Sequence, residues 1–176
     1  MASNLKDKMR IVEDFPSEGI SYKDITTILQ DKEAFQESVK VLEEALFGED
    51  YDYILGIEAR GFIFGAALAY ATNSGFLMAR KAGKLPGDLV NAKYALEYGH
   101  ADIELDRDSF PEGARIVVLD DLLATGGTAT AVCQLVEEIG GKVVTSLFLT
   151  ELTELGGRKK LEDAGYGVKS ILTWDH

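Results

Sequence analysis

The chain has 176 residues, of which 46% are hydrophobic and 27% charged, and its formal net charge is −12. This composition suits one globular domain with a sizeable core and excludes disordered and collagen-like chains. The surplus of acid argues against broad binding to nucleic acid or anionic membranes, because phosphate backbones are bound chiefly through clustered Lys and Arg. Any anionic ligand must therefore be held locally.

The sequence contains no signal for the membrane or the secretory route. No apolar run reaches the roughly 18 residues of a membrane-spanning helix, and residues 1–10 are too charged for a secretory signal. The single cysteine, Cys133, has no partner for an intramolecular disulfide, which fits a reducing compartment. We therefore expect a cytoplasmic protein with neither a membrane nor a nucleic-acid partner.

Apolar runs of strand length alternate with stretches of helical periodicity along the chain. In chain order, the pattern predicts a helix at 32–47, a strand at 53–57, a helix at 61–72, strands at 76–79 and 115–119, a helix at 128–139, a strand at 143–149, a helix at 154–164 and a weaker strand at 168–173. Gly48 and Gly140 are expected helix stops. This alternation indicates an α/β fold with a mainly parallel, twisted sheet flanked by helices. Ligands of such folds bind beyond the carboxyl ends of the strands, so functional residues should follow strands.

Two regions depart from this alternation. Residues 1–30 hold a short amphipathic segment and a turn-rich stretch, which we expect to form a small cap over the sheet edge. Residues 81–112 are rich in glycine and proline with short strand-like pieces, which predicts a mobile loop or hairpin. We therefore divide the chain into a cap (1–30) and a core (31–176) that includes the mobile segment at about 81–112.

The run from 115 to 128 carries the clearest chemical signal. A buried strand leads into two carboxylates, Asp120 and Asp121, and then into a turn of small residues at the start of a helix. This turn can present successive backbone N–H groups to a phosphate at the positive end of the helix dipole, so we call it the phosphate cradle. It consists of Ala124, Thr125, Gly126, Gly127 and Thr128.

The two carboxylates suggest the rest of the ligand. At a strand end they can accept hydrogen bonds from sugar hydroxyls or meet a hydrated divalent cation. Phosphate, sugar and metal together describe a phosphorylated ribose. The alternative is an ordinary strand-to-helix turn in which Thr125 or Thr128 caps the helix. The adjacent acids disfavour it, because their repulsion is costly unless a cation or hydroxyl donors relieve it.

Residues 117–129 closely resemble the signature of the type I phosphoribosyltransferases, which bind 5-phosphoribosyl 1-pyrophosphate (PRPP) with magnesium. Further runs, at 14–16 with 19–25, 58–65, 80–87 and 94–99, resemble the branch of that family that takes adenine and follow its order along nearly the whole chain. The resemblance implies the family's fold, with a small N-terminal hood and a mobile catalytic loop. It also implies transfer of phosphoribosyl from PRPP to adenine, giving AMP and pyrophosphate, as in purine salvage.

The resemblance also implies roles for individual residues. The cradle would hold the 5′-phosphate and Asp120 and Asp121 the ribose, with magnesium carried by PRPP, at most water-bridged to one of these acids rather than bound directly by the protein. The pyrophosphate-binding residues would be Glu58, Ala59, Arg60, Arg80, Lys81 and Lys84; the adenine-binding residues Ser21, Tyr22 and Lys23; the catalytic residues Glu97, Arg60 and Lys84; and the loop residue Tyr98. In this family the peptide before Ala59 is commonly cis.

Some of these roles agree with the residues themselves. Arg80, Lys81 and Lys84 form the densest basic cluster in an acidic chain, and cations on a flexible segment suit a pyrophosphate leaving group. Tyr22 offers a flat face for stacking on a base, where many family members have Phe. The role of Glu97, which would share a proton with N7 of adenine as a general acid, rests on the resemblance alone.

The resemblance further implies a homodimer and leaves three rival functions. One is a sister enzyme that takes hypoxanthine or xanthine on the same scaffold. Another is a PRPP-sensing regulator without catalysis, although such regulators usually add a basic face or an extra domain. A generic dinucleotide binder is disfavoured, since no G-x-G-x-x-G run follows the first strand.

Overall fold

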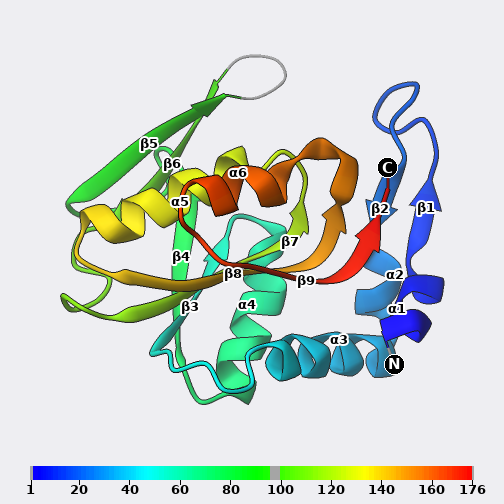
Figure 1. The fold of residues 1–176 in the computed structure, drawn as a ribbon, viewed down its shortest axis with the longest axis horizontal. Coiled ribbons are helices and arrows are strands. Elements are labelled where there is room, and N and C mark those ends of the chain that lie inside the picture. Colours follow the sequence, from blue (N-terminus) through cyan, green and yellow to red (C-terminus); the bar gives the residue numbers. More distant parts are fainter. Residues whose placement is uncertain (1, 96–99, 176) are drawn as a thin grey trace.

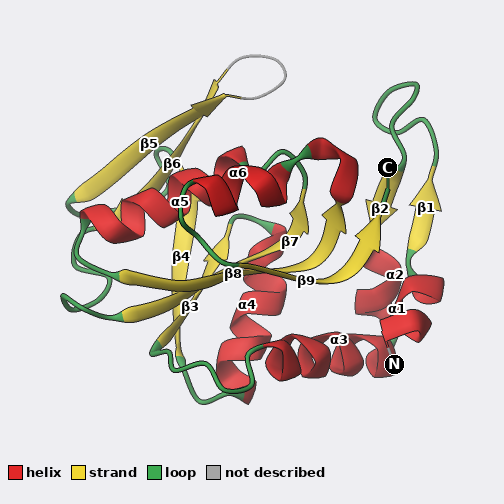
Figure 2. Cartoon of the chain, in the orientation of Figure 1, coloured by secondary structure: helices red, strands yellow, loops and turns green. Residues whose placement is uncertain are grey.

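A computed structural model describes residues 2–95 and 100–175, with the side chains given from residue 4 onward. Within these residues, seven strands form one sheet in the order β5-β6-β4-β3-β7-β8-β9, and a separate two-stranded sheet pairs β1 with β2. The five strands from β4 to β9 in this order are parallel, whereas β5 and β6 are antiparallel. The expected α/β fold with a mainly parallel sheet and flanking helices is confirmed (Figures 1 and 2).

The element bounds follow the chain. They are α1 (Ala2–Lys8), β1 (Arg10–Val12), β2 (Tyr22–Asp24), α2 (Thr26–Gln30), α3 (Lys32–Ala45), β3 (Tyr53–Ile57), α4 (Arg60–Ala71), β4 (Gly75–Lys81), β5 (Leu89–Ala95), β6 (His100–Asp106), β7 (Arg115–Leu123), α5 (Gly127–Glu138), β8 (Lys142–Leu152), the 3-10 helix η1 (Thr153–Leu155), α6 (Gly157–Asp163) and β9 (Val168–Trp174).

The sheet carries a hydrophobic core on each face. One core packs β-strand residues such as Val118 and Phe148 against α5, α6 and the β5–β6 hairpin. The other packs Val117 and Leu119 against α1, α2, α3 and α4. Successive residues of β7 alternate between the two cores, which explains why its apolar run is continuous rather than alternating.

Two expected elements, a strand and a helix, differ from the structure in their extent or continuity. The strand expected at 115–119 continues to Leu123, so Asp120 and Asp121 lie inside β7 rather than after it. Both carboxylates keep their place in the ladder because β8 runs alongside as far as Leu152. The helix expected at 154–164 is divided into η1 and α6 by Gly156, whose φ of +74° ends the first and opens the second.

Residues 81–112 contain a regular antiparallel hairpin of β5 and β6, paired over seven positions, rather than short strand-like pieces. The pairing of Arg80 with Glu104 and of Lys81 with Ile103 joins this hairpin to β4. Arg80 and Lys81 therefore end a strand, and of the basic cluster only Lys84 lies in the turn that follows.

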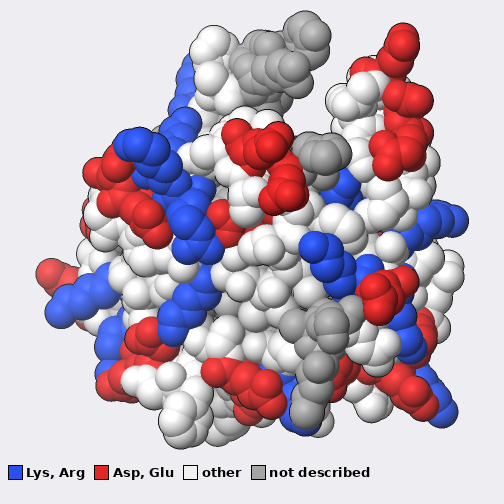
Figure 3. Space-filling view, turned by 45° about the vertical axis from the view of Figure 1, so that its right-hand side comes forward, with Lys and Arg blue, Asp and Glu red and all other residues white. Residues whose placement is uncertain are grey.

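The two hairpins, β1–β2 and β5–β6, stand on either side of the carboxyl ends of the parallel strands (Figure 1). The face in Figure 3 intersperses acidic and basic side chains, with acidic ones gathered over the tip of the β1–β2 hairpin at the upper right. Among the described residues, no helix is long and apolar enough to cross a membrane.

Candidate functional site

The phosphate cradle joins β7 to α5 and leaves the start of the helix open. Gly126 adopts the left-handed conformation, with φ of +81°, and no side chain caps the first N–H groups of α5. The cradle residues, together with Asp120 and Phe148, line a small pocket of about 90 Å³. Because neither Thr125 nor Thr128 caps α5, the free N–H groups and the helix dipole remain available to an anion.

The first turn of α6 forms a second wall of the cradle. A Cβ atom on Gly126 would lie 2.8 Å from the carbonyl oxygen of Gly157, and one on Gly157 would lie 2.4 Å from that of Ala124. The Lys160 Nζ lies 3.8 Å from the position that a Cβ on Gly127 would take. An ammonium beside the positive end of α5 raises the local potential further, which favours an anion at this position.

Asp120 and Asp121 lie side by side on β7 but have different surroundings. Asp121 is 3% exposed, and its Oδ2 lies 3.1 Å from the Nε of Arg60. Asp120 lines the cradle pocket, and its Oδ1 accepts a hydrogen bond of 2.8 Å from the Asp121 backbone N–H. The sheet thus directs Asp120 to the cradle and Asp121 to α4.

These environments shift the acidity of both carboxyl groups. Burial and the neighbouring charge of Asp121 raise the pKa of Asp120 well above its ordinary value. Burial also raises the pKa of Asp121, while the Arg60 guanidinium opposes that rise. The Asp121 N–H and the charge of Arg60 favour the ionised form of Asp120 but do not outweigh its burial, so a hydroxyl donor or a further cation would stabilise that carboxylate.

Arg60, the first residue of α4, connects one of the two acids expected to bind the ribose with the expected base site. Its Nε pairs with Asp121, its Nη1 donates a hydrogen bond of 2.9 Å to the Tyr22 hydroxyl, and its Cζ lies 5.8 Å from the centre of the Tyr22 ring. The edge of Phe15 packs on the same ring. Tyr22, Arg60 and Asp121 thus form one connected row of side chains.

The remaining adenine-binding candidates flank Tyr22, Ser21 just before β2 and Lys23 within it, and their side chains contact each other rather than Tyr22. The Lys23 Nζ donates to the Ser21 Oγ at 2.7 Å and lies 5.0 Å from the centre of the Trp174 ring. Alternation along the strand accounts for this arrangement. The roles expected of Ser21 and Lys23 rest on their backbone groups and not on these side chains.

The carboxylate of Glu58 accepts hydrogen bonds from all three residues of the basic cluster, Arg80, Lys81 and Lys84. Its side chain is 6% exposed and accepts hydrogen bonds from the Lys84 Nζ at 2.7 Å, the Arg80 Nη2 at 3.3 Å and the Lys81 backbone N–H at 2.8 Å. Burial raises the pKa of Glu58, but these three donors outweigh it and lower the pKa to about 2. The peptide between Glu58 and Ala59 is cis, as the resemblance implies.

The structure therefore brings most of the expected residues to one place. Arg80 and Lys84 lie on Glu58, two residues from Arg60, although the Lys81 side chain is exposed. Arg80 Nε is buried and has no hydrogen-bond partner among the described residues. Glu97 and Tyr98 lie outside the described residues.

The described residues contain no group of three or more His, Cys, Asp or Glu side chains placed to hold a metal ion. Asp120 and Asp121 nevertheless suit a magnesium ion that arrives with most of its ligands on a diphosphate. Of the two, Asp120 is the better placed for such a contact, because Arg60 already pairs with Asp121.

Sequence reasoning missed three features of this site. It did not find the clamp made by the Glu58 side chain, the hydrogen bond of the Tyr22 hydroxyl, or the wall that Gly157 and Lys160 add to the cradle. Contacts between segments far apart in the chain leave no periodic signal. The pair of glycines at 156 and 157 was the one local hint of a close approach.

Comparison with known proteins gives one consistent answer. Residues 21–176 match the family model described as the phosphoribosyl transferase domain. The chain is 50% identical to the adenine phosphoribosyltransferase of Clostridium tetani over 172 residues, which cover 98% of this chain and 99% of that protein. It is also 50% identical over 171 residues to the enzyme of the same name from Alkaliphilus metalliredigens, covering 97% of this chain and 99% of that protein.

Solved structures agree in fold over nearly the whole chain. The adenine phosphoribosyltransferase from Thermoanaerobacter pseudethanolicus superposes with a TM-score of 0.95 at 48% identity, covering 99% of this chain and all of that one. The enzyme from Saccharomyces cerevisiae, solved with an imino-altritol bisphosphate and adenine, gives a TM-score of 0.90 at 40% identity and covers 97% and 98% of the two chains.

Proposed function

The chain belongs to the adenine phosphoribosyltransferase family, and we propose that the site described above transfers the phosphoribosyl group of PRPP to adenine, giving AMP and pyrophosphate. The observation that carries this assignment is the row Tyr22–Arg60–Asp121, which places an aromatic face for a base within one side chain of the acids for a ribose. This reaction makes the protein a purine-salvage transferase.

The binding of PRPP divides among three parts of the site. The backbone N–H groups of the cradle hold the 5′-phosphate, and Asp120 and Asp121 accept hydrogen bonds from the ribose hydroxyls. Arg60, Arg80, Lys81 and Lys84, together with the backbone at Glu58 and Ala59, receive the pyrophosphate. Magnesium carried by PRPP would neutralise part of the diphosphate charge, and Asp120 or Asp121 would accept hydrogen bonds from its water ligands.

The catalytic steps make modest chemical demands on the protein. When the bond between the ribose and the pyrophosphate breaks, positive charge develops on the ribose and negative charge on the departing pyrophosphate. Arg60 and Lys84 stabilise the negative charge. Tyr22 stacks on adenine while the main chain of Ser21 and Lys23 fixes its edge, and Glu97 shares a proton with N7. Positioning and charge stabilisation therefore supply most of the rate.

The alternatives receive less support. A sister enzyme for hypoxanthine or xanthine, or a regulator that only senses PRPP, would need a difference in the base site or an added module. The curated relatives named for adenine match 98% of this chain and 99% of their own length at about half identity.

A homodimer is the assembly that the surface supports. Helix α4 is apolar on nearly all sides, and Ile63 and Tyr70 on its outer face are 39% and 91% exposed. Met78 on the adjoining β4 is 45% exposed. We propose that a second copy covers this face. We also propose that residues 1–30 complete the base site and that the protein acts in the cytoplasm, where a buried free thiol such as Cys133 stays reduced.

Product analysis tests the proposed reaction directly. Purified protein with PRPP and magnesium should convert adenine to AMP, measured by liquid chromatography, and should release one pyrophosphate per AMP. Parallel reactions with hypoxanthine and xanthine should give no more than a trace of nucleotide. Preferential use of either base, or PRPP binding without turnover of any base, would contradict the assignment.

A further inference from the structure

The phosphate cradle is shaped by contact with α6 as well as by its own sequence. Gly126 and Gly157 face each other with no side chain between them: a Cβ on Gly157 would lie 2.7 Å from Leu123 Cδ1 and 3.0 Å from the Gly126 nitrogen. At such distances a shift of Gly157 must displace the cradle backbone, because close-packed atoms transmit strain rather than absorb it. The place of Gly157 thus sets the place of the phosphate-binding N–H groups.

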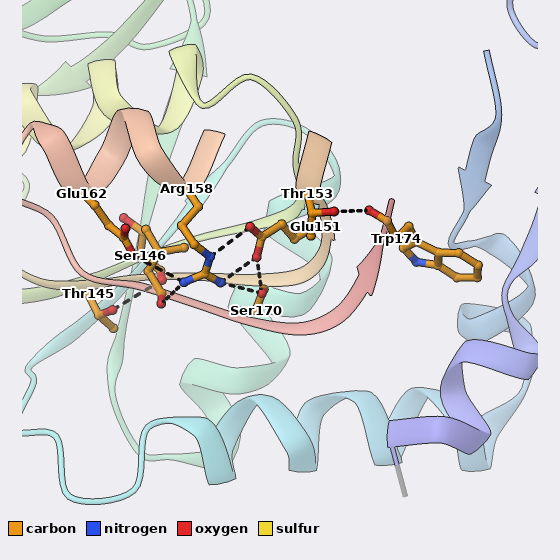
Figure 4. Close-up of polar contacts among 9 residues, drawn as sticks. Thr145, Ser146, Glu151, Thr153, Arg158, Glu162, Ser170 and Trp174 are labelled. Carbon is orange, nitrogen blue, oxygen red and sulfur yellow. Dashed lines mark hydrogen bonds and ion pairs between the residues drawn. The ribbon is translucent and has the colours of Figure 1, made fainter. Parts of the chain in front are cut away.

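The next residue, Arg158, fixes Gly157 through a network at the end of the sheet (Figure 4). Its Nε and Nη2 donate to the two carboxylate oxygens of Glu151 at 3.0 and 2.6 Å. Its Nη2 also donates to Ser170 Oγ at 3.0 Å, and its Nη1 donates to the Val168 carbonyl at 3.0 Å. The guanidinium group of Arg158 is therefore held by residues of both β8 and β9.

The network is built for a fixed geometry. Glu151 is 3% exposed, and Ser170 donates a second hydrogen bond to the oxygen that receives Arg158 Nη2. Planar guanidinium and carboxylate groups joined by two parallel hydrogen bonds allow little rotation, and a lysine cannot reproduce that pairing. Glu151 belongs to β8, the strand next to β7. One wall of the cradle follows β7, and the other, at Gly157, is tied to β8 through Arg158. Both walls are therefore fixed to the same sheet.

We infer that Glu151 and Arg158 are positioning residues for the 5′-phosphate, which they serve by holding Gly157 against the phosphate cradle. This inference rests on the proposed function, because it assigns a task to residues that touch no substrate. A purely stabilising pair would affect the binding of every ligand in proportion to its effect on folding. A positioning pair should affect the phosphorylated ligands selectively.

The test compares two variants with one matched control. Arg158→Lys keeps the charge and removes the bidentate fork, whereas Gly157→Ala leaves the fork intact and places a methyl group against the Ala124 carbonyl. The control, Arg115→Lys, weakens a similar pairing of arginine with Asp50 and Asp52 at the opposite end of β7. The measurements are AMP affinity by calorimetry, steady-state KM for PRPP and for adenine, and thermal unfolding.

Both variants should bind AMP about 10-fold more weakly and raise KM for PRPP by a similar factor. The values of kcat and of KM for adenine should change less than about twofold. A raised KM with unchanged kcat means that binding is lost equally in the ground state and the transition state. The control should match the parent in AMP binding. Parent-like AMP affinity in both variants, or equal losses for PRPP and adenine that follow thermal stability, would overturn the inference. A parent protein that neither binds nor forms AMP would instead refute the proposed function.

Discussion

We expect Asp120 to lower the stability of the folded protein while it contributes to the binding of PRPP. Burial and the charge of Asp121 raise its pKa, so the folded state loses stability as the pH rises from about 3.8 towards that raised value, and the loss is complete above it. We predict that Asp120→Asn, which preserves shape and the hydrogen bond from the Asp121 N–H, raises the free energy of unfolding at pH 7 by about 1 kcal/mol. The same variant should raise KM for PRPP, since a neutral amide is a weaker acceptor for ribose hydroxyls.

The dependence of stability on pH tests whether the Asp120 carboxylate destabilises the folded protein. Chemical denaturation of parent and variant should show the largest difference near neutral pH and none below about 3.8, where Asp120 is protonated in both the folded and the unfolded state. A variant less stable than the parent at pH 7 would show that the carboxylate is a net stabilising group.

Glu58 should behave in the opposite way. Its folded-state pKa of about 2 lies below the ordinary 4.5, so its contribution to stability is complete above pH 4.5 and is lost as the pH falls through about 2. We predict that Glu58→Gln lowers the free energy of unfolding at pH 7 by about 1 kcal/mol, a discounted figure because Lys84 is half exposed. Denaturation curves between pH 2 and 7 should show the two proteins converging at the acid end.

A matched control is Glu44→Gln, which breaks a surface pair with Lys40 separated by 4.0 Å. It should change stability by no more than about 0.5 kcal/mol. Equal effects of the two substitutions would show that the Glu58 clamp is no stronger than a surface pair.

Local patterns predicted the identity of most candidate residues but not their partners. The strand, the acids and the glycine pair of 115–128 could be read in order, which is why the cradle was found from the sequence. The ion pair of Arg60 with Asp121 joins residues about sixty positions apart, and the bond from Arg60 to the Tyr22 hydroxyl joins helix α4 to a strand of the small sheet. Such contacts depend on tertiary packing, which the periodicity of a single sequence does not reveal.

At the scale of elements, the contact between α4 and β7 aligns the two halves of the site. A Cβ on Gly61 would lie 2.9 Å from the Leu119 carbonyl and 3.0 Å from Asp120 Oδ1. We predict that Gly61→Ala pushes the first turn of α4 away from β7, lowers the free energy of unfolding by about 1–3 kcal/mol and displaces Arg60. Thermal unfolding and KM for PRPP should both worsen.

Gly167→Ala serves as the comparison for that prediction. Its Cβ would lie 3.3 Å from Thr145 Oγ1, a milder crowding in a turn between α6 and β9. It should leave KM for PRPP unchanged. An unaltered KM in Gly61→Ala would mean that Arg60 does not depend on the close approach of α4.

Element boundaries were predicted best where periodicity and breakers coincide. The strand expected at 53–57 matches β3 at both ends, and Gly48 and Gly140 follow the ends of α3 and α5 within a few residues. The end of β7 was misplaced, since two aspartates normally disfavour a strand and only the neighbouring β8 keeps them in it. For residues 81–112 the sequence predicted a mobile loop or a hairpin, and the pairing of β5 with β6 confirms the hairpin.

For the whole molecule, the net charge of −12 is compatible with a polyanionic substrate because the positive groups are concentrated. Arg60, Arg80 and Lys84 converge on one end of the sheet, and the dipole of α5 and the ammonium of Lys160 meet at the cradle. The remaining acid is dispersed over the surface, where it keeps copies of the protein apart except on faces that lack charge.

The outer face of α4 is such an uncharged face, and it supports the last prediction. We predict that Tyr70→Asp, which places a charge on a side chain that is 91% exposed, converts the dimer to a monomer without unfolding it. Light scattering coupled to size exclusion should give about twice the chain mass of 19.2 kDa for the parent and that mass for the variant. Phe47→Asp is the matched control, since Phe47 is 94% exposed just beyond the end of α3 rather than on α4, and its replacement should leave the dimer intact. A monomeric parent at micromolar concentration, or a dimer that survives Tyr70→Asp together with Met78→Asp, would show that α4 is not the interface.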